Sequence, residues 1–329
     1  MEKLEDKKMA TRDAVGHALV ELGEENKDVV VLDADLSTST KTAAFKERFP
    51  SRFFDCGIAE ANMIGVAAGL STTGKIPFAA SFAIFVAERA FEQIRNSVCY
   101  PNLNVKIIGS HSGFSSSEDG ATHQAIEDIA ILRAVPDMTI VSPCDYFETF
   151  AAIKKAASFS GPVYIRTGKF STLNVNGPEY IENFKIGKGV VLKNGGVVCL
   201  VATGIEVHFC LKAAELLEEE GIKTAVVNIS TIKPLDEELI LDIAKDVEFL
   251  FTVEEHSVIG GLYSAICELL CEKCPRTVYK IGIKDKFGES ATTQELLENS
   301  ELDSYSIYNR VKKVILNKDR DFNYFSLES

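Results

Sequence analysis

Residues 53–85 read FFDCGIAEANMIGVAAGLSTTGKIPFAASFAIF, and they contain the pattern that repeats along the whole chain. A short apolar run at 51–57 is followed by a helix-like segment at 58–72 and by a second apolar run at 76–81. Apolar strands that alternate with longer helical segments are typical of a parallel sheet with helices on both faces. The stretch therefore predicts the α/β fold class.

The same alternation continues on both sides of this stretch. In the segment that follows it, Val86, Ala90, Ile94 and Val98 recur at every fourth position, which indicates one apolar helix face. We expect further strands at 28–36, 104–113, 137–143 and 161–169, and further helices near 11–23, 82–98, 124–133 and 145–159.

Residues 171–187, STLNVNGPEYIENFKIG, interrupt the alternation with Asn, Gly and Pro, as a linker would. Apolar runs and helix-like segments then resume as far as about residue 285. We therefore predict two α/β domains, at 1–185 and 186–329, the second being the smaller.

The chain has 329 residues, of which 46% are hydrophobic, and a formal net charge of −13. This charge disfavours nucleic acid and anionic membranes as partners. The sequence has no apolar run of about 18 residues and no apolar secretion signal. Most of the eight cysteines fall in apolar segments, where reduced thiols behave as small hydrophobic groups. We therefore expect a cytoplasmic protein.

Glu60 stands alone among glycine, alanine and aliphatic residues, about one turn into a helix that we expect to be buried on all sides. One interpretation is structural, because the free N–H groups at a helix N-terminus stabilise a carboxylate. The other is functional, because a desolvated carboxylic acid can share a proton with a ligand nitrogen. Phe82 and Phe85 could then supply a flat wall for a ring, although core packing explains this pair equally well.

Other polar residues follow the predicted strands, where ligands bind in open parallel sheets. The loop GSHSGFSSSEDGATHQ places two histidines close to acidic residues, and histidine is the usual proton-transfer group near neutral pH. An arginine fork could bind a phosphate or carboxylate, although each arginine taken singly could be an ordinary ion-pair residue. The candidates are Arg12, Asp33, Asp35, Ser39, His111, Glu118, Asp119, His123 and Arg166.

Four motifs together resemble the pyrimidine-binding domain of transketolases: VVVLDADLSTST, the quoted stretch 53–85, SEDGATHQAIEDIAILRAVPDMTIVSPCD and GPVYIRTGK. VATGIEVHFCLKAAELLEEEGI and VEEHSVIGGLYSAI are similar to the carboxy-terminal domain of the same family. The resemblance covers nearly the whole chain in the right order. It is strongest to the carboxy-terminal subunit of split, two-subunit transketolases.

The resemblance implies roles for individual residues. Glu60 resembles the glutamate that hydrogen-bonds N1′ of the aminopyrimidine of thiamine diphosphate. Phe82 and Phe85 match aromatic positions against that ring, while Leu36 and Asp35 match residues beside the cofactor and substrate. Glu60, His111 and His123 would be catalytic. The positions that match sugar-phosphate and hydroxyl contacts are Arg12, Ser39, His111, Asp119, His123 and Arg166.

The resemblance also implies what this chain lacks. In the family, the amino-terminal half binds the diphosphate and Mg²⁺ (or Ca²⁺) through a GDG motif, which is absent here. It therefore implies a partner amino-terminal subunit that supplies the metal site, an α2β2 assembly, and no metal ligands in this chain. The implied reaction is reversible transfer of a two-carbon ketol unit from a ketose phosphate to an aldose phosphate.

At two places the sequence departs from the transketolase pattern, and these departures leave the identity of the substrate open. Serines occupy 115–117, where the family usually has a glycine before EDG, and Glu88 replaces an aromatic residue of single-chain members. Alternatives within thiamine enzymes are a 1-deoxyxylulose-5-phosphate synthase or the β subunit of a 2-oxoacid dehydrogenase. A noncatalytic regulatory subunit with the same fold is the alternative outside catalysis.

Overall fold

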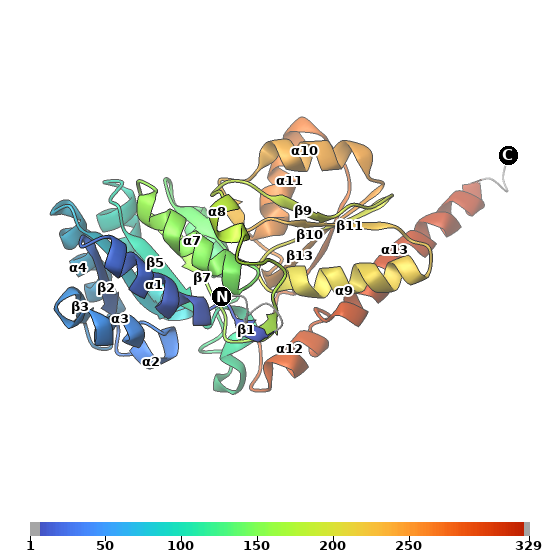
Figure 1. Ribbon diagram of the computed structural model, residues 1–329. Coiled ribbons are helices and arrows are strands. Elements are labelled where there is room, and N and C mark those ends of the chain that lie inside the picture. The colour runs from blue at the N-terminus through green and yellow to red at the C-terminus, as the bar shows by residue number, and fades with distance from the viewer. Residues whose placement is uncertain (1–6, 326–329) are drawn as a thin grey trace.

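The larger sheet of the computed structural model has seven strands in the order β12-β6-β7-β5-β4-β2-β3. The structure describes residues 7–325 (Figure 1). All neighbouring pairs are parallel except β12 with β6, and the strands β2, β5, β6 and β7 are buried along their whole length. The bounds are β2 (Val29–Asp33), β3 (Phe53–Asp55), β4 (Ile76–Phe82), β5 (Lys106–Ser110), β6 (Thr139–Val141), β7 (Val163–Arg166) and β12 (Thr231–Lys233).

Helices cover both faces of this sheet, which confirms the predicted α/β class, and each face has its own apolar core. One face packs against α1 (Asp13–Glu25), α3 (Ala43–Arg48) and α7 (Tyr146–Ser158). The other packs against α4 (Glu60–Thr72), the π-helical turns η2 (Phe85–Arg89) and η3 (Ile94–Cys99) with α5 (Phe91–Gln93) between them, and α6 (Asp128–Arg133). The helix predicted at 124–133 begins only at Asp128, because Ala125 still forms a parallel bridge with Ser112.

The second lobe has a five-stranded sheet in the order β14-β13-β10-β11-β9, in which only β9 is antiparallel to its neighbour. Its strands are β9 (Val190–Lys193), β10 (Val198–Ala202), β11 (Thr224–Asn228), β13 (Phe249–Ser257) and β14 (Val278–Ile283). One face carries α9 (Glu206–Glu219), α12 (Thr293–Asn299) and α13 (Ser304–Phe325), and the other carries α10 (Glu237–Asp246) and α11 (Leu262–Lys273). Figure 1 shows α13 extending away from this lobe.

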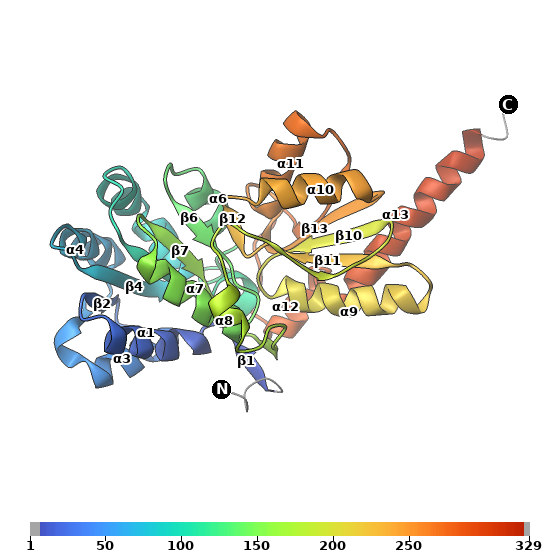
Figure 2. The same cartoon turned by 45° about the horizontal axis from the view of Figure 1, so that its top comes forward.

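The segment predicted as a linker, 171–187, is ordered. Its strand β8 (Ser171–Leu173) pairs antiparallel with β1 (Lys8–Ala10), and α8 (Tyr180–Asn183) packs against the first lobe. In addition, β12 lies within the predicted second domain by sequence but pairs with β6 of the first sheet (Figure 2). The two lobes are therefore joined through a shared sheet as well as through the chain.

The ends of the two predicted domains, residues 1–6 and 326–329, lie outside the described residues. Within residues 7–325, none of the helices is both long enough and apolar enough to cross a membrane.

Candidate active site

Four neighbouring strands, β5, β4, β2 and β3, bring most of the predicted site residues to one edge of the larger sheet. The carboxyl ends of parallel strands share an edge, so loops that are distant in sequence meet there. Asp35, Leu36 and Ser39 follow β2, Glu60 follows β3, Phe82 ends β4 with Phe85 just beyond it, and His111 follows β5.

Asp33, a strand-end candidate to which the sequence analysis assigned no role, organises the loop after β2. Its buried carboxylate accepts hydrogen bonds from Leu36 N at 2.6 Å, Thr40 Oγ1 at 2.7 Å and Thr42 Oγ1 at 2.8 Å. Burial raises the pKa of Asp33, and these three bonds oppose that rise. The loop turns at Asp35, which has a φ of 63° and is exposed. Asp33 thus fixes the position of Leu36 at the site.

Arg12 and His111 are in direct contact. Nη1 of Arg12, at the start of α1, lies 2.8 Å from His111 Nε2 and 3.2 Å from the carbonyl oxygen of Ser39. Because a guanidinium only donates, Nε2 is the acceptor and the His111 proton is on Nδ1, 3.0 Å from Ser110 Oγ. Three of the predicted phosphate-binding positions are therefore adjacent.

Burial, followed by the positive charges of Arg12, Lys169 and Lys41, lowers the pKa of His111 to about 3. The imidazole is therefore neutral at pH 7. An unfolded histidine titrates near about 6.5, so the unfolded chain binds the extra proton between the two pKa values. The stability that His111 contributes is full above about pH 6.5 and is lost as the pH falls toward 3.

This linkage gives a test by His111→Asn, because asparagine tolerates the positive φ of 56° at this position. We expect the melting temperature of the variant to fall less steeply than that of the wild-type protein between pH 6.5 and 4.5. Thermal unfolding followed by circular dichroism over this range measures both slopes. Parallel slopes would show that His111 is not buried in its neutral form.

The aromatic side chains form a continuous wall. The ring of Phe82 stacks on His111 with a centroid separation of 4.0 Å and lies nearly parallel to Phe85 at 5.7 Å. His123 meets Phe85 edge-on at 5.1 Å, and Leu36 packs against the same cluster. The wall offers a flat apolar surface with imidazole groups at its rim.

Glu60 lies beside this wall. It is the first residue of α4 rather than one turn inside it, and its side chain is 3% exposed. Its Oε1 lies 3.4 Å from Ser81 Oγ and 3.5 Å from Arg89 Nη1. Both contacts are long, so this buried carboxyl group can still accept or donate a stronger hydrogen bond.

The prediction that α4 is buried on all sides is wrong. One side of the helix is exposed over Asn62, Gly65, Val66 and Gly69, and Ile58 just before it is 76% exposed. We call these five residues the α4 face. The helix thus presents an exposed side, with the apolar Ile58 and Val66, next to the buried Glu60 carboxyl group.

The loop after β5 carries the unusual serines 115–117 and the remaining candidates Asp119 and His123. Asp119 ends the 3₁₀ turn η4 (Gly113–Asp119) and is exposed. The hydroxyl of Ser116 donates to the carbonyl oxygen of His123 at 2.6 Å, while Ser117 Oγ lies 2.6 Å from Thr293 Oγ1 of the second lobe. The unusual serines therefore brace the loop that carries His123.

Glu88, the other departure from the family pattern, lies in η2 close to Glu127. Partial burial and the neighbouring Glu127 carboxylate raise the pKa of Glu88. The acid therefore joins a carboxylate pair beside α6.

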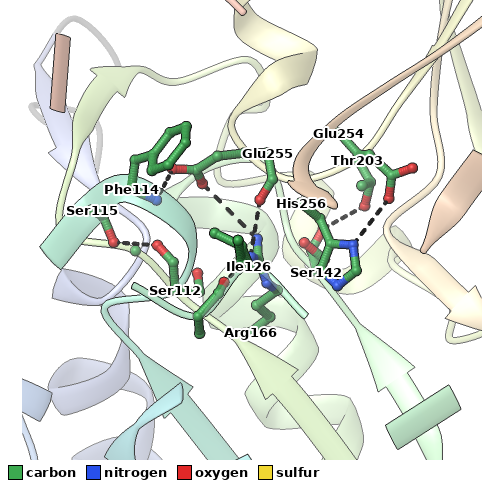
Figure 3. A network of polar contacts seen from close by, with 12 residues as sticks. Ser112, Phe114, Ser115, Ile126, Ser142, Arg166, Thr203, Glu254, Glu255 and His256 are labelled. Carbon is green, nitrogen blue, oxygen red and sulfur yellow. Dashed lines mark hydrogen bonds and ion pairs between the residues drawn. The ribbon is translucent and has the colours of Figure 1, made fainter. Parts of the chain in front are cut away.

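Arg166 lies in the interface between the lobes, where its side chain contacts Asp128, Ala125 and Glu255. Its Nε is 2.9 Å from Asp128 Oδ2, and its Nη2 donates to the carbonyl oxygen of Ala125 at 3.1 Å. Nη2 also donates to the carbonyl oxygen of Glu255 at 3.0 Å, and Figure 3 shows Arg166 beside Glu255. Glu255 also accepts from Phe114 N at 2.8 Å. The guanidinium thus ties β7 to α6 and β13, and the role of Arg166 as a phosphate ligand stays a prediction.

Sequence reasoning missed Ser81, Arg89, Asp128 and Glu255 as residues of the site and its support. It did find Asp33, as a polar residue at the end of a strand, but assigned it no role. Within residues 7–325, no group of three or more His, Cys, Asp or Glu side chains is placed to hold a metal ion.

Comparison with known proteins identifies both lobes. Residues 7–172 match the family described as "Transketolase, pyrimidine binding domain", and residues 187–307 match "Transketolase, C-terminal domain". A Methanocaldococcus jannaschii protein assigned as a transketolase C-terminal section is 47% identical over 312 residues, covering 94% of this chain and 98% of its own.

Two further proteins match over almost their whole length. The 6-deoxy-6-sulfo-D-fructose transketolase subunit SqwH of Clostridium sp. (strain MSTE9) is 40% identical, covering 94% of this chain and 95% of its own. A solved structure described as "Split gene transketolase, inactive beta4 tetramer" is 53% identical with a TM-score of 0.86, covering 93% of this chain and 98% of its own. The chain belongs to the transketolase family and is similar in extent to the subunits of its split members.

Proposed function

We propose that this chain is the carboxy-terminal subunit of a thiamine-diphosphate-dependent transketolase, which transfers a two-carbon ketol unit between a ketose phosphate and an aldose phosphate. The observation that carries the proposal is the buried Glu60 carboxyl group beside the stacked Phe82–Phe85 pair. A planar heterocycle with a ring nitrogen fits this combination, because the aromatic wall takes its face and the carboxyl group meets its edge.

The residues present fit the aminopyrimidine half of the cofactor. Phe85 would hold the ring, Leu36 would support it, and Glu60 would share a proton with N1′. When bound, thiamine diphosphate supplies a nucleophilic carbon that carries the two-carbon unit. This chain's task is to bind the ring, orient it, exclude water and hold the proton at Glu60 Oε1 or Oε2.

The proposed substrate contacts lie at the polar rim of the wall. Arg12, Ser39 and His111 would bind the phosphate, and Asp35, Asp119 and His123 would contact hydroxyl groups. Arg12 Nε is buried and, within the described part of the chain, has no hydrogen-bond partner, so it can donate to an anion. This local basic cluster is what an anionic sugar needs on a chain with a net charge of −13.

The metal and diphosphate sites would come from an amino-terminal partner subunit, with two copies of each chain in an α2β2 enzyme. The relatives named as a subunit and as a C-terminal section support this, as does a related split-gene subunit described as an inactive β4 tetramer. The exposed α4 face, next to Glu60, is a suitable contact for that partner. On its own, this chain should be inactive.

A charge on the α4 face should weaken the assembly. Val66 is 37% exposed, so Val66→Lys should leave the fold intact but put an ammonium group into the apolar contact. We expect at least a tenfold loss of affinity for the partner, measured by analytical ultracentrifugation. Val191→Lys, at a valine that is 42% exposed on β9 of the second lobe, is the control. Equal affinities for both variants would place the partner elsewhere.

Reconstitution tests the proposed function as a whole. The chain should be purified with its amino-terminal partner and assayed with xylulose 5-phosphate and ribose 5-phosphate, with thiamine diphosphate and Mg²⁺ added or withheld. Cofactor-dependent ketol transfer supports the proposal. Consumption of pyruvate instead would indicate a 1-deoxyxylulose-5-phosphate synthase or a 2-oxoacid dehydrogenase, and a stable but inactive complex would indicate a regulatory subunit.

A further inference from the structure

Arg89 occupies the surface on which the proposed function places the pyrimidine ring. It follows Phe85 by four residues in the π-helical turn η2, and π-helical turns are frequent at functional sites. Its guanidinium carbon lies 3.9 Å from the centre of the Phe85 ring, and its Nη1 lies 3.5 Å from Glu60 Oε1. The residue was not among the candidates predicted from the sequence.

These two contacts reproduce what a bound aminopyrimidine would make. The guanidinium is flat and delocalised, it stacks on an aromatic face, and its N–H groups point at a carboxylate. A planar aminopyrimidine ring would stack on the same Phe85 face and form a hydrogen bond with the same Glu60 carboxyl group. The two planar groups cannot occupy this position together.

The contact between Arg89 and Glu60 is weak enough for the arginine side chain to move away. Its side chain is 52% exposed, whereas that of Glu60 is 3% exposed, so the arginine can move into solvent while the carboxyl group cannot. The separation of 3.5 Å is long for an ion pair between charged groups. The positive charge of Arg89 also acts on the neighbouring Glu88, where it opposes the rise in pKa. After leaving Glu60, the guanidinium can therefore pair with the Glu88 carboxylate.

We propose that Arg89 is a cofactor-site residue that takes the place of the pyrimidine ring in the cofactor-free subunit and leaves when thiamine diphosphate binds. The inference rests on the proposed roles of Glu60 and Phe85. In this arrangement the guanidinium lies 3.5 Å from Glu60 Oε1 and covers one face of Phe85. The apparent cofactor affinity is therefore reduced by the fraction of molecules in which Arg89 occupies the site.

The test is calorimetric titration of thiamine diphosphate, with Mg²⁺ present, into the reconstituted complex. Arg89→Ala removes the competing group, and we expect its Kd for the cofactor to be about 3- to 10-fold lower than that of the wild-type complex. Arg95→Ala is the matched control, because Arg95 lies in η3 and donates to Asn96 at 2.6 Å on an exposed surface. Its Kd should equal that of the wild type.

A second variant separates stacking from charge. Arg89→Lys keeps a positive charge but loses the flat stacking group, so its Kd should lie between those of wild type and Arg89→Ala. An unchanged or higher Kd for Arg89→Ala, in a wild-type complex that binds the cofactor and transfers ketol units, would overturn the role of Arg89 alone. A wild-type complex that binds no thiamine diphosphate would overturn the proposed function together with this inference.

Discussion

Replacing Glu60 by glutamine should lower the turnover of the assembled enzyme by at least about 100-fold, the size of effect expected for a lost proton-transfer group. Glutamine has nearly the same shape as glutamate and can still donate or accept one hydrogen bond, so the ring should still bind. It cannot take up and release a proton at N1′. The loss should therefore lie in kcat at saturating thiamine diphosphate, measured by steady-state ketol transfer.

The neighbour of Glu60 provides the control. Ser81 Oγ lies 3.4 Å from Glu60 Oε1, so Ser81→Ala disturbs the surroundings of the carboxyl group without removing it. We expect a change in kcat of less than about 10-fold, because a long neutral hydrogen bond contributes about 1 kcal/mol. Near wild-type turnover for Glu60→Gln at saturating cofactor would contradict the N1′ role.

Arg166→Met should be the most destabilising of the substitutions considered. The side chain lies in the lobe interface and is buried with Asp128 and Glu255, whose carboxylates raise the pKa of Arg166 even though burial alone would lower it. Methionine leaves both acids without their positive partner. Breaking a buried ion pair on one side costs about 3–5 kcal/mol. For a chain of this length we expect the melting temperature to fall by roughly 4–7 °C.

The protonation of Glu255 gives this prediction a pH dependence. Burial raises the pKa of Glu255 to about 7, so in the variant the acid can become neutral by binding a proton as the pH falls. The destabilisation by Arg166→Met should therefore be smaller at pH 6 than at pH 8, in melting curves recorded at both values. Arg48→Met, which breaks the exposed pair with Glu24, should cost less than about 1 kcal/mol at either pH. Equal losses for the two variants would show that Arg166 is not a structural tie.

The parallel strands of both sheets could be predicted because buried parallel strands consist of short apolar runs, whereas the antiparallel edge strands β9 and β12 were not expected. The spacing of Val86, Ala90, Ile94 and Val98 indicated the type of helix as well as its presence. Its period of four exceeds the 3.6 residues of an α-helical turn, and the structure has two π-helical turns in this segment, with all four side chains fully buried. The sequence pattern thus matched a wider helix than the one expected.

The sequence predicted those site residues whose place follows from the strand that precedes them, but not those that depend on contacts with distant parts of the chain. Glu60, His111 and Phe82 lie at strand ends, and strand ends can be found from periodicity. The partners of Arg166 could not be found, because Glu255 is 89 residues away in the sequence and a different fold would bring other groups to the same arginine. Arg89 could not be found either, since its position depends on how the helical turn after β4 is wound.

The pairing of β12 with β6 has a consequence for the engineering of this protein. A fragment that ends near residue 185 would lack β12 and would leave β6 as an open strand edge. Open edges invite intermolecular pairing, so such a fragment should aggregate. Residues 7–325 should therefore be exchanged among relatives as one unit, which keeps β12 beside β6 and keeps α13, with its buried Val311, intact.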